Sequence, residues 1–308
     1  GRCAVKMMRQ QIISAASGFS IETTPGSAAK VANFADHLAA GTTVNVTYLA
    51  GSDAAETIAV CQRLRDEGMR PVPHVAARNI ESAGQLDDYL GALTGEAGVD
   101  EALVIAGGLD RPAGPYDCTM QVLESGLFGK HGIRRIAVAG HPEGSPDIHD
   151  DALAAALADK NQWAKENAVD MYIETQFCFE AEVVLAWERR IRAAGNRLPI
   201  HIGVPGPATL KTLLKFAQMS GIGPSMRVLT RQARNLSRLL MVQAPDRLVA
   251  DLAIAMAEDP ACLIAGFHLY PFGGLAKTSA WINAVAAGQF DLQDGGRFTV
   301  TEPLKTAL

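Results

Sequence analysis

Polar side chains stand at or near the carboxyl ends of several short β-branched runs in this sequence. Glu22 stands near the end of the first run, His74 near the end of the third and Gln176 near the end of the sixth. A carboxyl group buried in a strand needs either a partner or a function, so Glu22 is the strongest single candidate for chemistry. The other polar residues of this kind are Thr23, Thr24, Thr47, Tyr48, His141, Glu143, Glu174, Thr175, His201, His268 and Tyr270.

The fourth run ends differently, in the sequence Ala106-Gly107-Gly108. It offers no side chain for chemistry, but two glycines let a flat ligand approach the backbone closely. Structural interpretations remain open for two of the polar residues. Gln176 could be a core amide bonded to the backbone, and His201, in the middle of its run, is predicted to be structural.

An arginine series gives a second group of charges. Its spacing alternates between i,i+4 and i,i+3, which predicts that the side chains share one face of a helix. We interpret this as a solvated face, with a face that contacts an anion as the alternative. The residues are Arg227, Arg231, Arg234 and Arg238.

Strands and helices must position these residues. Eight apolar, β-branched runs are predicted strands, and the stretches between them, rich in Ala, Leu, Glu and Lys, are predicted helices. The strands are predicted at Ser20–Thr24, Val44–Ala50, Val72–Ala77, Ala102–Gly107, Arg135–Gly140, Met171–Phe179, Ile200–Val204 and Leu263–Tyr270. Ser52 is expected to cap a helix that reaches Glu67. Pro207 is expected to open another, and a third spans Ala181–Ala194.

Eight strands alternating with helices over 308 residues predict a single (β/α)8 barrel. A doubly wound open sheet also alternates, but it more often carries a glycine-rich turn after the first strand. Here the first strand is followed by ETTPG, which is not that turn. We therefore expect one domain over residues 1–308, with residues 1–17 forming an N-terminal extension or a covering helix.

The composition bounds the class of protein. With 48% hydrophobic and 20% charged residues the chain is globular, and its net charge of -5 argues against general nucleic-acid binding. The apolar stretches are too short to span a membrane. Five scattered cysteines form neither a disulfide framework nor a metal-binding cluster, so we expect a reduced, cytoplasmic protein without a metal site.

Eight short segments follow one another along the chain: SIETTPG, VNVTYLAGS, PVPHVAARN, LVIAGG, RIAVAGHPEGSP, YIETQFCFEA, IGVPGPATLKTLLKFA and GFHLYPF. In this order they resemble the methylenetetrahydrofolate reductase family, over roughly Phe19 to Trp281. The resemblance implies a (β/α)8 barrel. It also implies an enzyme that interconverts 5,10-methylenetetrahydrofolate and 5-methyltetrahydrofolate, usually with FAD carrying hydride from NADH or NADPH.

The resemblance assigns roles to residues of this sequence. Glu22 matches the glutamate taken to be the acid that opens the imidazolidine ring, and Gln176 matches a glutamine that hydrogen-bonds the pterin. Leu210 stands where the family often has a phenylalanine that stacks on the folate or the nicotinamide. Tyr270, in the last matching segment, is predicted to contact the substrate as well.

The cofactor is the point where the sequence departs from the family. Four residues match positions that line the flavin site: Thr47, His74, Asn161 and Lys165. However, the chain reads AGG where flavin-binding members typically read RGD, and His141 stands where a tyrosine often contacts the cofactor. Two interpretations stay open. Either FAD binds with help from the backbone of Gly107 and Gly108, or NADH or NADPH passes hydride directly to the folate.

The sequence thus predicts a folate oxidoreductase, with a non-redox tetrahydrofolate-binding or methyl-transfer barrel as the alternative. An intact Glu22 favours the oxidoreductase, because binding alone needs no ring-opening acid. The expected partner is a tetrahydrofolate derivative. Members of the family are often homo-oligomers, but the sequence itself does not specify the oligomeric state. The choice of NADH or NADPH and the physiological direction stay open.

Overall fold

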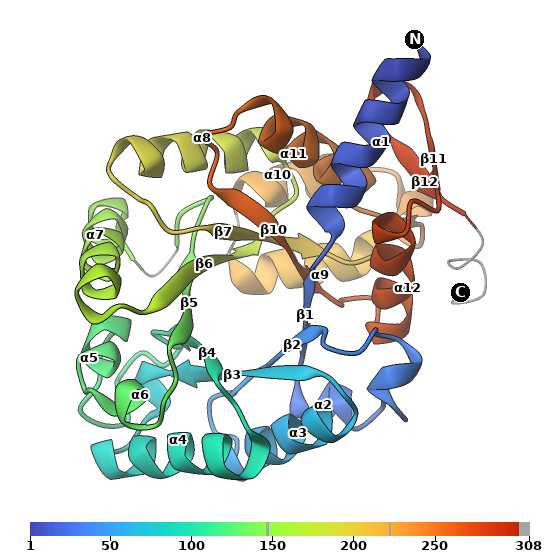
Figure 1. Ribbon diagram of the computed structural model, residues 1–308. Helices are drawn as coiled ribbons and strands as arrows, with labels where there is room; N and C mark the ends of the chain where they lie inside the picture. Colours follow the sequence, from blue (N-terminus) through green and yellow to red (C-terminus); the bar gives the residue numbers. More distant parts are fainter. Residues whose placement is uncertain (146–147, 222, 302–308) are drawn as a thin grey trace. The chain divides into compact units, whose positions relative to one another are not determined.

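The computed structural model describes residues 1–145, 148–221 and 223–301. Eight parallel strands form a closed barrel in the order β1-β10-β7-β6-β5-β4-β3-β2 (Figure 1), which confirms the predicted (β/α)8 fold class. The barrel strands are β1 (Ser20–Thr23), β2 (Thr43–Val46), β3 (Arg70–Ala76), β4 (Glu101–Ile105), β5 (Arg135–Gly140), β6 (Asp170–Phe177), β7 (Ile200–Pro205) and β10 (Ile264–Tyr270).

The helices and the smaller strands complete the fold. The α-helices are α1 (Arg2–Ala16), α2 (Pro25–Ala28), α3 (Ala54–Asp66), α4 (Ala83–Ala97), α5 (Thr119–Leu123), α6 (Leu127–Lys130), α7 (Asp150–Asn167), α8 (Ala181–Ala193), α9 (Leu210–Ser220), α10 (Gly223–Gln232), α11 (Asp246–Glu258) and α12 (Leu275–Ala286). The 3-10 turns are η1 (Phe34–Asp36), η2 (Ala77–Asn79), η3 (Leu236–Arg238) and η4 (Asp294–Gly296). Two antiparallel pairs lie outside the barrel: β8 (Ala208–Thr209) with β9 (Val242–Gln243), and β11 (Phe290–Leu292) with β12 (Phe298–Val300).

All eight predicted strands are present, but the second is shorter than expected. It was predicted to reach Ala50, and it ends at Val46. The chain then turns tightly, because the amide of Ser52 donates to the carbonyl of Leu49 at 3.1 Å and Gly51 has a φ of 78°. Leu49 and Ala50, the last two residues of the predicted strand, belong to this turn and therefore do not extend the strand.

Two helix starts also differ from the prediction. Asp53, rather than Ser52, caps α3, since its carboxylate accepts from the amide of Ala55 at 3.0 Å. Similarly, Pro207 does not open a helix. α9 begins at Leu210 and is capped by Thr209, whose hydroxyl accepts from the amide of Thr212.

The prediction that the four arginines share one helix face is wrong. α10 ends at Gln232, so Arg234 lies beyond it and Arg238 belongs to η3. Only Arg227 and Arg231 remain on α10. The helical spacing that predicted one shared face is therefore interrupted by a change of element.

The chain divides into two compact units, and β6 contributes to both. The β1–β5 unit comprises Ser20–Gly140 and Ala156–Glu174. The β7–β10 unit comprises Gly1–Phe19, His141–Ala155 and Thr175–Leu308, of which 146–147, 222 and 302–308 lie outside the described residues. One domain over residues 1–308 stays a prediction.

In the β1–β5 unit, alternate strand residues build the interior. Val72, Leu103, Ala137 and Tyr172 pack together, one from each of β3, β4, β5 and β6, with Ile105 against them. Because side chains alternate along a strand, residues two positions away from these share the same face. On the outside of the unit, α3 packs against α4 (Figure 1).

In the β7–β10 unit, the segment predicted as an extension or covering helix forms α1. This helix packs against α11 and α12 (Figure 1) and buries Ile12. Arg9 fixes it by donating to the carbonyls of Gly288 at 3.1 Å and Phe290 at 2.7 Å. The Arg9 guanidinium also lies 4.7 Å from the centre of the Phe290 ring, a cation–π contact.

Two further observations bear on the class of protein. Within residues 1–145, 148–221 and 223–301, no helix combines the length and the apolar character needed to cross a bilayer. All five cysteines have free thiols. Burial raises the pKa of the Cys61 and Cys178 thiols, so neither is a candidate nucleophile.

Candidate functional site

Glu22 and His74 meet in the β1–β5 unit. Glu22 Oε1 lies 3.3 Å from His74 Nε2, and the two side chains are only 17% and 10% exposed. In the pairing of β1 with β2, Glu22 lies opposite Asn45. In the pairing of β2 with β3, Asn45 lies opposite Val72, which precedes His74 by two residues. These register partners share the interior face of the strands. The structure thus brings together a predicted acid and a predicted cofactor residue.

A second carboxylate lies beside this pair. Glu174 on β6 is 4% exposed, and its Oε2 accepts a 2.7 Å hydrogen bond from Asn45 Nδ2. Carboxylate oxygens of Glu22 and Glu174 lie within 4.8 Å of one another. The sequence placed Glu174 at a strand end but gave it no role, and it did not identify Asn45. The signal for Asn45 is its polar side chain inside the apolar run VNV.

Several buried polar atoms of this unit have no hydrogen-bond partner among the described residues. They include Thr47 Oγ1, at the end of β2, and His74 Nε2, for which the Glu22 contact lacks hydrogen-bond alignment. Asn79 Oδ1, just beyond β3, is a third. Buried polar groups are nearly always hydrogen-bonded, so these atoms mark places where a bound molecule or water would supply the bond. Asn79 is a candidate that the sequence did not single out.

The loop after β4 presents backbone rather than side chains. Gly107 has a φ of +92°, a conformation that favours glycine, and a Cβ there would make a tight 3.3 Å contact with the Cβ of Ala76. A Cβ at Gly108 would meet nothing within 4 Å, which leaves open space beside the chain. Arg78 pins this loop by donating to the carbonyls of Leu109 and Asp110 at 2.8 and 2.9 Å.

Asn161 and Lys165, the other two predicted flavin contacts, lie one turn apart on α7. Asn161 donates through Nδ2 to the carbonyl of Leu157 in the same helix at 2.9 Å, and Lys165 is exposed. Because it is exposed, Lys165 is not part of the largely buried Glu22–His74 pair. The role of Asn161 and Lys165 in cofactor binding stays a prediction.

The predicted substrate residues lie in the β7–β10 unit. Gln176 and Tyr270 are both half-buried, and the Tyr270 hydroxyl donates to the carbonyl of Thr175 at 3.0 Å. Tyr270 stacks on Phe272, with ring centres 5.8 Å apart. The Thr175 hydroxyl donates to the carbonyl of Gln176 at 2.8 Å. Tyr270 and the backbone of Gln176 are thus tied to one residue, Thr175.

Leu210 and His141 are placed differently. Leu210 is fully buried in a cluster with Leu213, Ala217 and Leu229, so its side chain packs into the protein rather than toward a solvent-accessible surface. His141 directly follows β5 and is half-buried, and its carbonyl accepts from the amide of Gly144 at 3.0 Å. The ligand contacts of Leu210 and His141 stay predictions.

Gly203 on β7 shapes the position of Tyr270. A Cβ at Gly203 would lie 2.6 Å from the carbonyl oxygen of Thr175 and 2.7 Å from Tyr270 Cε2, both too close for van der Waals contact. Gly203→Ala is therefore expected to destabilise the protein by about 1–3 kcal/mol and to displace Tyr270. Urea denaturation measures the loss. Gly266→Ala on β10 is the matched control, since a Cβ there meets nothing within 4 Å. Equal stability of the two variants would contradict the prediction.

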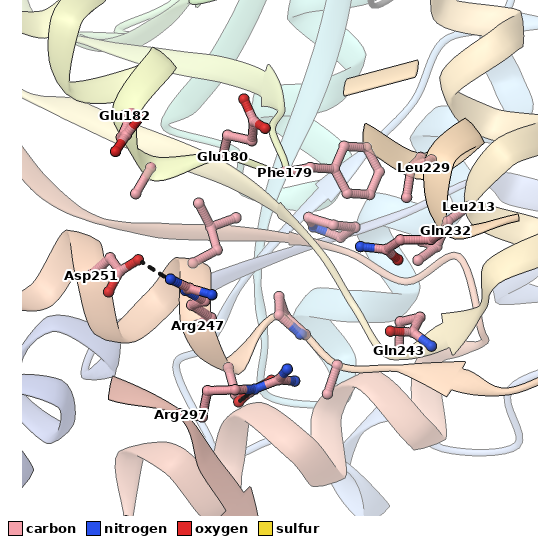
Figure 2. A pocket seen from close by; sticks show the side chains of 16 residues that line it. Phe179, Glu180, Glu182, Leu213, Leu229, Gln232, Gln243, Arg247, Asp251 and Arg297 are labelled. Atoms are coloured by element: carbon pink, nitrogen blue, oxygen red, sulfur yellow. Dashed lines mark hydrogen bonds and ion pairs between the residues drawn. The ribbon is translucent and has the colours of Figure 1, made fainter. Parts of the chain in front are cut away.

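A separate cavity of about 380 Å³ lies in the β7–β10 unit (Figure 2). Phe179, Leu213 and Leu229 form its apolar wall, and Arg247 pairs with Asp251 at 3.8 Å on another side. None of the residues predicted to bind substrate or cofactor lines it. The cavity shares Leu213 and Leu229 with the buried cluster around Leu210, but it contains no predicted site residue.

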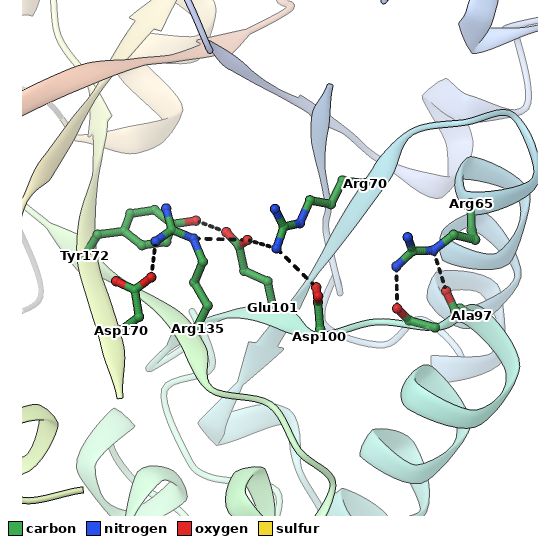
Figure 3. Close-up of polar contacts among 9 residues, drawn as sticks. Arg65, Arg70, Ala97, Asp100, Glu101, Arg135, Asp170 and Tyr172 are labelled. Atoms are coloured by element: carbon green, nitrogen blue, oxygen red, sulfur yellow. Dashed lines mark hydrogen bonds and ion pairs between the residues drawn. The ribbon is translucent and has the colours of Figure 1, made fainter. Parts of the chain in front are cut away.

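At the amino-terminal ends of the strands, the β1–β5 unit holds a different polar cluster (Figure 3). Glu101 begins β4 and is 2% exposed. Its carboxylate accepts from the Tyr172 hydroxyl at 2.6 Å and lies 3.2 Å from Arg135 Nε and 3.7 Å from Arg70 Nη2. Arg135 also donates to Asp170 at 2.6 Å. Burial opposes the charge of Arg135, but these carboxylates outweigh it and raise its pKa.

We attribute a structural role to this cluster. In (β/α)8 barrels chemistry takes place at the carboxyl ends of the strands, whereas polar residues at the amino-terminal ends contribute to stability. Glu101 and Arg135 are the first residues of their strands, and Tyr172 is the third of β6. Glu22 and His74, by contrast, stand in the later halves of β1 and β3.

Comparisons with known proteins agree with the fold and identify the family. A curated 5,10-methylenetetrahydrofolate reductase from Pectobacterium carotovorum subsp. carotovorum is 27% identical over 181 residues, which is 58% of this chain and 58% of that protein. This chain thus matches less than two thirds of that relative's length. A structure from Clostridium thermocellum, described as an uncharacterized protein that binds two copies of 5-methyl-5,6,7,8-tetrahydrofolic acid, shares the fold. Its TM-score is 0.51 at 13% identity, covering 86% of this chain and 92% of that one. The family profile of methylenetetrahydrofolate reductase matches residues 7–270, so the chain belongs to that family.

Proposed function

We propose that this protein interconverts 5,10-methylenetetrahydrofolate and 5-methyltetrahydrofolate, with NADH or NADPH as the source of hydride. The observation that carries the proposal is the carboxyl group of Glu22, 17% exposed and 3.3 Å from His74, on the interior face of β1. Membership of the methylenetetrahydrofolate reductase family supports it.

The reaction needs an acid at this place. The bond between the bridging methylene and the ten-position nitrogen breaks, and that nitrogen leaves as an amine that takes up a proton. The electrons of the other nitrogen form an iminium with the methylene carbon, which then accepts hydride and becomes a methyl group. A carboxyl group in a mostly buried position can hold the required proton at neutral pH, because burial disfavours its charged form. Glu22 is assigned this role.

Substrate contacts are assigned in the β7–β10 unit. The side-chain amide of Gln176 carries both a donor and an acceptor, which suits the edge of a pterin ring. Tyr270 offers its ring face, and Thr175 holds its hydroxyl at 3.0 Å. Leu210 is fully buried, and its contact with the substrate stays a prediction.

The residues at the ends of β2, β3 and β4 fit a flat polar cofactor. Thr47 Oγ1 and His74 Nε2 are buried atoms without a hydrogen-bond partner among the described residues, and Gly108 leaves open space beside the backbone. These residues would hold FAD, which when bound accepts hydride from the nicotinamide and passes it to the folate. The same groups would border a nicotinamide ring if hydride moves directly.

The visible absorption spectrum tests the cofactor assignment. We expect the purified protein, after incubation with excess FAD and desalting, to interconvert the two folates with NADH or NADPH. Flavin absorption that is bleached by the reduced nicotinamide would assign the hydride shuttle to FAD. A colourless protein with the same activity would assign direct transfer. In that case Gly107, Gly108 and His141 would become candidates for the nicotinamide pocket.

A colourless protein without this activity, even when FAD is supplied, would overturn the proposal. The alternative is then a non-redox barrel that binds tetrahydrofolate or transfers its methyl group. Titration with 5-methyltetrahydrofolate distinguishes this alternative from a protein without any folate site, because binding would survive in the first case only.

A further inference from the structure

The β1–β5 unit contains two carboxyl groups, of Glu22 and Glu174, where the proposed reaction needs one. Glu174 is 4% exposed and is more deeply buried than Glu22. The proposed ring opening assigns no role to Glu174. Oxygens of the two groups lie within 4.8 Å of one another. Two ionised carboxylates at this separation in a buried site repel strongly, so one proton is retained by the pair.

Asn45 determines which carboxylate keeps its charge. Its Nδ2 donates to Glu174 Oε2 at 2.7 Å, and a hydrogen bond from an amide donor favours the ionised form of the acceptor. Asn45 is fully buried and lies opposite Glu22 in the β1–β2 register, so its position is fixed by the sheet. The proton of the pair is therefore directed to Glu22.

We infer that Glu174 is a positioning residue that keeps Glu22 protonated at neutral pH through its own negative charge, the two carboxyl groups sharing one proton. This inference rests on the proposed function for its purpose, because only the ring-opening step needs Glu22 as an acid. The sharing of the proton itself is a property of the protein alone. No atom other than a proton is transferred within the pair.

Other titratable groups can also affect the titration of Glu22 and Glu174, so their contributions must be measured separately. His74 Nε2 lies 3.3 Å from Glu22 Oε1, and Tyr172, which also bonds Glu101, interacts electrostatically with Glu174. His268 is buried on β10, the strand next to β1 in the barrel order. His74→Gln and His268→Gln variants therefore accompany the titration.

The first experiment needs no activity. Protein labelled with ¹³C at the glutamate carboxyl carbons is titrated by NMR. In the wild-type protein we expect two coupled steps, with the upper step at least about one pH unit above an ordinary glutamate. The upper step should disappear in Glu22→Gln and in Glu174→Gln, and persist in both histidine variants and in Glu96→Gln, which changes an exposed glutamate on α4. A wild-type protein with no carboxyl titrating above the ordinary range would overturn the inference, whether or not the protein is a reductase.

The second experiment links the pair to catalysis. For the wild-type enzyme, turnover should fall as pH rises through the upper step, because Glu22 then loses its proton. For Glu174→Gln this fall should begin about one pH unit or more lower, with activity close to wild type at acid pH. A purely structural role for Glu174 would lower turnover equally at every pH, and that result, or an unmoved profile, would contradict the inference. If the NMR titration shows the shared proton but no variant catalyses the reaction, the proposed function fails and the proton sharing stands.

Discussion

Glu22→Gln is expected to lower turnover by about 10²- to 10⁴-fold while leaving the affinity for 5-methyltetrahydrofolate nearly unchanged. The amide is close to the carboxyl group in size and can keep a contact to His74, 3.3 Å away, but it cannot deliver a proton. The ten-position nitrogen would then leave unprotonated, which raises the barrier of ring opening without changing the ground-state contacts of the folate. Steady-state kinetics and a binding titration measure the two quantities.

Glu96→Gln provides the matched control for this substitution. It makes the same chemical change at an exposed position on α4 and should leave both turnover and affinity at the wild-type level. Glu22→Gln with wild-type turnover would remove Glu22 from the mechanism. A loss of folate affinity as large as the loss of turnover would instead assign Glu22 to substrate binding.

The proximity of Glu22 and His74 could be predicted from the sequence, but the residues that surround the pair could not. Both residues stand near the ends of predicted strands, and the ends of parallel strands meet at one edge of a barrel. The contact of Asn45 with Glu174 joins residues 129 positions apart. It depends on how the strands are registered, which the hydrophobic pattern of each strand does not specify to a single residue.

Local ambiguities account for the errors in the elements. Ser52 and Asp53 are both good capping residues, and the turn closed by Leu49 and Ser52 decides in favour of Asp53. The predicted arginine face failed because helical spacing continues across the end of α10 at Gln232. By contrast, the eight strands were recognised from apolar, β-branched runs, since burial on both faces leaves a signal in composition alone.

Glu101→Ala is expected to lower the free energy of unfolding by about 3 kcal/mol, because it removes the shared partner of a buried cluster. The Tyr172 hydroxyl, which donates to Glu101 at 2.6 Å, would be left without its acceptor in the interior. Arg135 would keep Asp170 at 2.6 Å but lose its buried counterion at 3.2 Å. Because the Arg135 side chain is 33% exposed, water compensates part of this loss, which places the expected value at the low end for a broken buried pair.

Asp100→Ala is the control that separates burial from charge. Asp100 lies 3.5 Å from Arg70, closer than the 3.7 Å between Arg70 and Glu101, yet its side chain is 59% exposed against 3% for Glu101. Its loss should cost less than about 1 kcal/mol, since solvent screens exposed ion pairs. Urea denaturation of both variants measures the difference. Equal destabilisation would mean that stability depends on the number of carboxylates near the arginines. A large effect in Glu101→Ala alone would show that the cluster stabilises the strands through its buried hydrogen bonds.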